Sequence, residues 1–121
     1  MHGNDFALLE SISAAATGVL VMAEGLERAE LDRSRITRQE ISRLLLVAAD
    51  AVGCLSSRVR TAMAELDVRA WLLTAERLRA GGATESDARW FAIQSLAPTT
   101  VGWLELYTSE TILPVVEREQ G

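Results

Sequence analysis

The sequence predicts an all-α fold, a four- or five-helix bundle whose helices run mostly antiparallel and which forms a dimer. Three observations support this prediction. Alanine, leucine, glutamate and arginine, all good helix formers, dominate the composition. Apolar residues recur at steps of three and four, and no strand-like alternation bounded by turn residues is present. No proline precedes Pro98 in this chain of 121 residues, which has the length of one ordinary domain.

The first predicted helix covers residues 5–30. Asn4 or Asp5 is suited to cap its N-terminus, because its side chain can accept a free amide hydrogen of the first turn. One face carries an apolar stripe, and a second face carries small residues that would let a neighbouring helix approach closely. The apolar stripe is Leu9, Ile12, Ala16, Val19, Ala23 and Leu26, and the small-residue stripe is Ser11, Ala14, Gly18 and Gly25.

The second predicted helix covers residues 38–65 and is expected to be central. Thr37 and Glu40 have the spacing of a capping box, in which each side chain satisfies a free backbone amide near the other. The apolar residues that follow alternate steps of four and three through successive heptads. Arg43 and Asp50 fall on the opposite side and are expected to face solvent. The seam is Ile41, Leu45, Ala48, Val52, Leu55, Val59, Ala62 and Leu66.

A turn is predicted near residues 65–67. After Leu66 the apolar residues move to another side of the helical wheel, at about 100° per residue. This change indicates either a new helix with Asp67 as its N-cap, which we favour, or one long helix that changes its packing partner.

Glycine and proline mark the ends of the remaining helices. Gly81 and Gly82 are typical of a helix C-terminus. Pro98 is expected to end the short helix before it, and Pro114 to kink or end the last helix, because proline removes a backbone donor. These signals predict helices over residues 67–80, 85–97 and 100–117, so that residues 1–121 form a single helical domain.

Charge and hydropathy restrict the partners and the compartment. The net charge is −5, which disfavours nucleic-acid binding because phosphate backbones attract basic surfaces. Residues 1–11 lack the basic start of a secretory signal, and the longest apolar segments fall short of the about 20 residues that a spanning helix needs. We therefore expect no membrane partner and a cytoplasmic location. In that reducing compartment Cys54 is interpreted as a small core residue.

The chemistry-bearing residues do not indicate an enzyme. The chain has no lysine, and its single histidine is His2, so its hydroxyl groups lack an ordinary activating base. Glu24, Glu27 and Glu30 share one helix face, but no second acidic pair is spaced to complete a magnesium site. We interpret them as a solvated helix end. The sequence therefore predicts no catalytic residue, no metal and no cofactor, and neither nuclease nor nucleotide hydrolase activity.

The aromatic residues gather between residues 71 and 107. Trp90 and Phe91 follow Arg89 directly, so they lie about 100° apart on a helix and cannot both enter one seam. We expect Phe91 to face the core and Trp90 to lie at the rim or against a partner. Core packing on two sides is the alternative to a contact patch of the kind enriched at interfaces. The candidate interface or pocket residues are Trp71, Arg89, Trp90, Trp103 and Tyr107.

Protein–protein association is the function that these patterns favour. The apolar stripes cover more helix surface than one small bundle can bury, and homodimerisation is a common way to cover the excess. An unknown protein partner would serve equally. The first alternative is a small-molecule or effector-binding bundle with an aromatic pocket. The second is an acidic inhibitor or immunity-type protein that binds a basic partner.

Overall fold

The computed structural model describes residues 3–107, and the prediction of an all-α fold is confirmed: these residues form helices and turns, with no strand among them. In chain order the helices are α1 (Gly3–Ala23), α2 (Arg28–Arg33), α3 (Arg35–Gly53), α4 (Ser57–Ala62), the 3₁₀ turn η1 (Ala64–Leu66), α5 (Val68–Ala80), α6 (Gly82–Phe91), the π-helical segment η2 (Ala92–Leu96) and α7 (Ala97–Tyr107).

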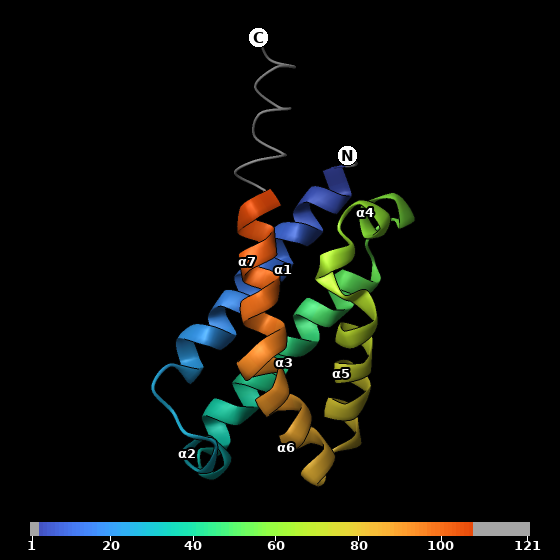
Figure 1. Ribbon diagram of the computed structural model, residues 1–121. Coiled ribbons are helices and arrows are strands. Elements are labelled where there is room, and N and C mark those ends of the chain that lie inside the picture. The colour runs from blue at the N-terminus through green and yellow to red at the C-terminus, as the bar shows by residue number, and fades with distance from the viewer. Residues whose placement is uncertain (1–2, 108–121) are drawn as a thin grey trace.

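The long helices lie side by side and alternate in direction (Figure 1). In that view α1 descends from the N-terminus, α3 ascends, α5 descends, and α6 continues upward into α7. The helix α1 packs against α3 and α7, while α5 packs against α3 and α6. Because α3 also contacts α2 and α6, it has the central position that its long apolar seam predicts.

The predicted apolar stripes supply much of the core. Every member of the first stripe up to Ala23 is buried, as is the seam on α3 and its continuation, except for the exposed Ala62. The small-residue stripe packs only in part. Leu44 Cδ1 lies 3.1 Å from where a Cβ of Gly18 would stand, which explains the glycine there, but Ser11 and Ala14 are exposed.

The first helix ends earlier than predicted. Gly25 has a φ of 76°, a left-handed conformation that ends a helix, so α1 stops at Ala23. The short α2 follows, and its first turn is capped when the carboxylate of Glu30 accepts the backbone N–H of Glu27, at 3.0 Å. Two of the three glutamates considered as metal ligands are thus used at a helix start.

The capping box predicted at Thr37 is wrong. Helix α3 begins at Arg35, and its N-cap is Ser34. The hydroxyl of Thr37 instead lies within the first turn, where it accepts a hydrogen bond from the Ser34 hydroxyl at 2.9 Å. The sequence therefore predicts a helix start in the correct region, but the N-cap is Ser34 and not Thr37.

The predicted second helix is broken into α3 and α4. Asp5, expected as an N-cap of its own helix, is buried, and its carboxylate accepts hydrogen bonds from the backbone N–H and hydroxyl of Ser56, at 3.0 and 2.9 Å. From the other side of the break, Arg60 donates to the carbonyl oxygens of Gly53 and Leu55. These contacts replace the helical hydrogen bonds lost at the corner. Cys54 lies in the break and is exposed, which corrects its assignment to the core.

The turn before α5 and the end of α5 are confirmed. Asp67 adopts a left-handed conformation with a φ of 52°, and its carboxylate accepts the backbone N–H of Ala70 at 3.1 Å. At the other end, Gly81 and Gly82 have φ values of 78° and 61°. Helix α6 starts directly at Gly82, three residues before the predicted start at residue 85.

Pro98 does not end a helix, which corrects the prediction. It is the second residue of α7, and α6, η2 and α7 form one ascending segment (Figure 1). The π-helical turn just before Pro98 shifts the hydrogen-bond register, and a residue without an N–H is tolerated at such a shift. The rest of the predicted helix over residues 100–117, with Pro114, lies outside the described residues, as does His2.

Helix α1 has the length and apolar composition of a membrane-spanning helix. From Asn4 to Ala23 its mean hydropathy is 1.8, so the expectation that no segment reaches this length is wrong. One third of this segment, 33%, is buried inside the fold, and its buried side chains pack where α1 meets α3 and α7. Core helices of water-soluble proteins and N-terminal signal sequences both pass this test of length and composition.

Candidate interaction surface

Helix α5 separates a core face from an outer face. Its buried residues recur at helical spacing around Trp71 and Leu78. On a helical wheel Arg69 and Glu76 fall on the opposite side, with Leu72 and Leu73 to either side of them. The two leucines are 44% and 42% exposed, which leaves a large apolar side chain on the surface to each side of the charged residues.

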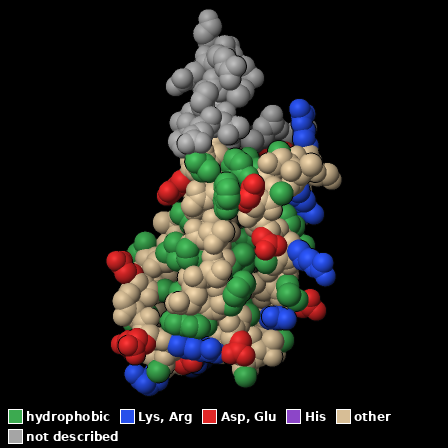
Figure 2. Space-filling view, viewed as in Figure 1, with side chains coloured by type: hydrophobic (Ala, Val, Ile, Leu, Met, Phe, Trp, Pro, Cys, Tyr) green, Lys and Arg blue, Asp and Glu red, His purple; other side chains and the backbone are tan. Residues whose placement is uncertain are grey.

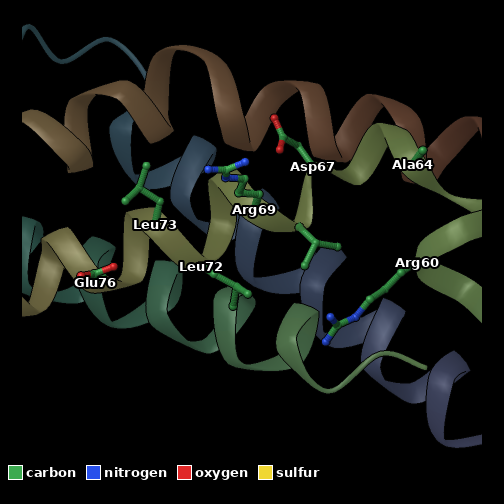
Figure 3. Close-up of a pocket in the computed structure, with 8 residues that line it drawn as sticks. Arg60, Ala64, Asp67, Arg69, Leu72, Leu73 and Glu76 are labelled. Atoms are coloured by element: carbon green, nitrogen blue, oxygen red, sulfur yellow. The ribbon is translucent and has the colours of Figure 1, made fainter. Parts of the chain in front are cut away.

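A groove of about 730 Å³ runs along this outer face (Figure 3). Figure 3 shows the labelled side chains projecting from α5 and from the α4–η1 region, with Leu72 and Leu73 pointing to different sides of α5. Apolar and charged side chains alternate around the groove. The lining residues are Arg60, Ala64, Asp67, Val68, Arg69, Leu72, Leu73 and Glu76.

The charged residues of the groove differ in whether they are already paired. Arg60 is held by the carbonyl oxygens at the end of α3, and Asp67 caps α5. Arg69 and Glu76 are exposed, and within residues 3–107 neither side chain makes a hydrogen bond or an ion pair. This pair of opposite charges, about two helical turns apart, is therefore free to meet groups from outside the chain.

Trp71 is a core residue. It has no exposed surface and is the largest of the fully buried side chains in the described part of the chain. Its indole Nε1 donates to the hydroxyl of Thr100 on α7, at 3.0 Å. The hydrogen bond links α5 to α7 inside the fold, so Trp71 lies on no outer surface.

Arg89, expected beside a contact surface, is only 4% exposed and is held by neighbouring helices. Its guanidinium donates to the Ser42 hydroxyl at 3.0 Å and pairs with Glu85 at 3.3 Å and Asp32 at 3.8 Å. The Ser42 hydroxyl in turn donates to Glu85 at 3.3 Å. Arg89 thereby joins α2, α3 and α6 from within, which corrects its predicted place on the surface.

Further ion pairs surround this network at the lower end of the molecule, where Figure 2 shows acidic and basic side chains close together. Arg28 binds Asp87 and the Ser86 hydroxyl, and Ser86 donates to Asp32 at 3.1 Å. A second cavity of about 410 Å³ opens here. Its charges balance, since two carboxylates and two guanidiniums line it. Its lining residues are Asp32, Arg38, Gly82, Ala83, Glu85, Ser86 and Arg89.

An ion pair on α3 lies at the surface of the fold. Arg43 donates from Nε to Glu40 at 2.6 Å, and this hydrogen bond, followed by the Coulombic attraction, lowers the pKa of the Glu40 carboxyl from its usual value. Both residues face solvent, as predicted for Arg43. Asp50, also exposed as predicted, pairs with Arg79 at 3.3 Å.

Phe91 does not face the core, which corrects the prediction. Phe91 is 48% exposed, whereas Trp90 is partly buried and packs against the core. The helical phase that buries Ala88 and Ala92 carries Phe91 outward. Predicting which of two adjacent aromatic residues is buried requires the rotation of the helix about its axis to be known to within one residue.

The different burial of Trp90 and Phe91 predicts an order of stabilities for their alanine variants. We expect Phe91→Ala to lower the free energy of unfolding by about 1 kcal/mol and Trp90→Ala by about 2–3 kcal/mol, because full burial of such rings makes truncation cost about 3–5 kcal/mol. Urea denaturation followed by circular dichroism measures both values. A larger loss for Phe91→Ala would contradict the assignment.

Trp103 and Tyr107 form an aromatic pair on α7. Their ring centroids lie 5.9 Å apart, both side chains are partly buried, and the Tyr107 hydroxyl donates to Glu65 in η1. None of the four predicted aromatic site residues lines either of the two cavities described above. The structure therefore distributes them over core and surface positions instead of gathering them around one of these cavities.

The sequence reasoning missed the outer face of α5. The helix was predicted from the apolar residues that follow Leu66, and the residues opposite them were given no role. The signal was present, because Leu72 and Leu73 fall away from the seam on the same wheel. A large apolar pair outside the predicted core face is an indicator of an interaction surface.

Comparisons with known proteins add no functional assignment: no protein-family model, no curated protein and no solved structure matches the chain.

Proposed function

We propose that the protein is a non-enzymatic association module that binds a protein chain through the outer face of α5. The observation that carries this proposal is the exposed pair Leu72 and Leu73 in a groove whose flanking charges, Arg69 and Glu76, have no partner in the described chain. Apolar residues at the centre of a contact, with charges at its rim, are the usual composition of a protein interface.

The alternatives considered from the sequence have less support. An aromatic ligand pocket would need Trp71 at a cavity, yet that side chain is in the core. A catalytic function has less support, because the chain contains no lysine and a single histidine at residue 2, and the described residues hold no cluster of metal-ligating side chains. The association proposal uses only side chains that are both exposed and unpaired.

Thiol labelling tests whether a partner covers this face. In a Cys54→Ser background, which removes the exposed native thiol, Leu73→Cys places a reporter in the lining of the groove. The matched control is Ile36→Cys, because Ile36 is 81% exposed and lies on a different helix. Maleimide labelling is measured in dilute purified protein, in concentrated purified protein and in an extract of the native cells.

We expect Leu73→Cys to react several times more slowly in the extract or at high concentration than in dilute solution, because a bound chain excludes the reagent. Ile36→Cys should react at one rate throughout. Equal rates for Leu73→Cys under all three conditions would contradict the proposal.

A further inference from the structure

We propose that the occupant of the α5 groove is a second copy of this chain, bound with the two α5 helices antiparallel so that Arg69 of each copy pairs with Glu76 of the other. This inference rests on the proposed function and names its partner. It follows from the order of four residues along the outer face of α5 and from the absence of other partners for the two charged side chains in the described chain.

The charges on the outer face of α5 match those of a second copy only when the two α5 helices run antiparallel. In a two-fold symmetric contact, residue i of one copy meets residue j of the other, and j meets i. If the axis passes between Leu72 and Leu73, positions 69 and 76 are exchanged by it, since both are equally far from that point along the helix. Each basic side chain then faces an acidic one, and the contact contains this pair twice.

A parallel arrangement has the opposite result. Arg69 would then face Arg69 of the second copy, and Glu76 would face Glu76. Like charges would lie together at both ends of the contact. Since like-charge juxtaposition at an interface is unfavourable, the charge order selects the antiparallel arrangement. The net charge of −5 adds a general repulsion between copies, and a face with balanced charge is where two copies can approach.

Along the helix the apolar residues lie at the middle of the proposed contact, on either side of the line that joins Arg69 and Glu76. Leu72 and Leu73 lie next to the symmetry axis and would meet the same pair from the second copy, while the ion pairs lie about 5 Å to either side along the helix. Packed helices have axes about 8–10 Å apart, a separation that an arginine and a glutamate side chain bridge together.

The area of the outer face of α5 limits the expected affinity of the dimer. One face of a 13-residue helix buries less than the about 800 Å² per partner that is typical of stable complexes. We therefore expect a dissociation constant in the micromolar range, and a dimer that forms reversibly with concentration.

Charge exchange tests the arrangement. The variants are Arg69→Glu, Glu76→Arg and the double exchange of both, measured by sedimentation equilibrium with the full chain from about 1 µM to about 1 mM. Arginine and glutamate are both good helix formers, and neither residue has a partner within residues 3–107, so folding should be unaffected. Circular dichroism and thermal denaturation verify this. Arg35→Glu on α3 is the control, because it changes the net charge by the same amount at another exposed site.

Each single variant should weaken the dimer by about tenfold to hundredfold, since exposed opposite charges become like charges in both halves of the contact. The double exchange should restore the native dissociation constant to within about threefold, because the same pairs re-form with their signs exchanged. An equimolar mixture of the two single variants should form a mixed dimer, since one carries two acidic and the other two basic positions on this face. Arg35→Glu should have a much smaller effect.

A chain that stays monomeric up to about 1 mM overturns the inference, as does a dimer that responds equally to Arg69→Glu and Arg35→Glu, or one that the double exchange fails to restore. These outcomes are separable from failure of the proposed function. Protection of Leu73→Cys in the extract, together with a monomeric purified protein, would keep the association module and replace the second copy by another chain.

Discussion

Replacing Trp71 by alanine should lower the free energy of unfolding by about 3–5 kcal/mol, the cost of deleting a fully buried aromatic side chain. Trp71 has no exposed surface and lies between α5 and α7. Because small domains are stable by only about 5–15 kcal/mol, this single change should remove a large part of the total. Urea denaturation monitored by far-ultraviolet circular dichroism measures the loss.

Two further variants separate packing from hydrogen bonding at this position. Trp71→Phe keeps most of the ring but leaves the buried Thr100 hydroxyl without its indole donor, which should cost about 1–3 kcal/mol. Adding Thr100→Val should recover part of that loss, because no buried polar group then lacks a partner. A loss below about 1 kcal/mol for Trp71→Ala would show that the side chain is not packed as described.

Replacing Arg89 by alanine should lower the free energy of unfolding by about 2–3 kcal/mol. Removing one partner of a buried charge pair costs about 3–5 kcal/mol when the other charge stays buried. Here Glu85 and Asp32 are partly exposed, so they regain water and the cost is lower. The Ser42 hydroxyl also loses its guanidinium donor.

Arg89→Met tests whether charge or volume matters more at this site. An apolar side chain of similar length keeps the packing, and such replacements of buried ions are often neutral, so we expect a smaller loss than for alanine. Arg43→Ala is the matched control, because Arg43 forms an exposed pair and should leave the denaturation midpoint almost unchanged. Equal midpoints for Arg89→Ala and Arg43→Ala would contradict the buried network.

Features governed by neighbouring residues could be predicted from the sequence. Asp67 caps α5 because its carboxylate is within reach of the Ala70 amide, and Gly81 ends α5 because it tolerates a positive φ. The burial of Ile12, Ile41 and their repeats follows from helical periodicity alone. Such signals need no knowledge of the rest of the fold.

Features created by contacts between distant segments could not be predicted. The seam through Leu55 and Val59 stays in phase across the break between α3 and α4, so periodicity does not reveal the break. The corner is stabilised in part by Asp5, which approaches from α1 and is far away along the chain. The burial of Arg89 likewise depends on Ser42 and Asp32, which come from other helices.

The candidate surface could be predicted from the sequence only in part. The positions of Leu72 and Leu73 follow from the helical wheel, but their exposure depends on which elements cover α5, and this is settled only by the packing of α3 and α6. That Arg69 and Glu76 lack partners is likewise a property of the folded chain.

The contact between α1 and α7 has a consequence for the order of folding. The packing of α1 on α3, of α3 on α5 and of α5 on α6 joins segments close along the chain, whereas α1 and α7 come from opposite ends of residues 3–107. Closing a longer loop has a larger entropic cost, so the local pairs form with smaller loops and favour rapid folding. The seam between α1 and α7 is then the last to form and the first to open.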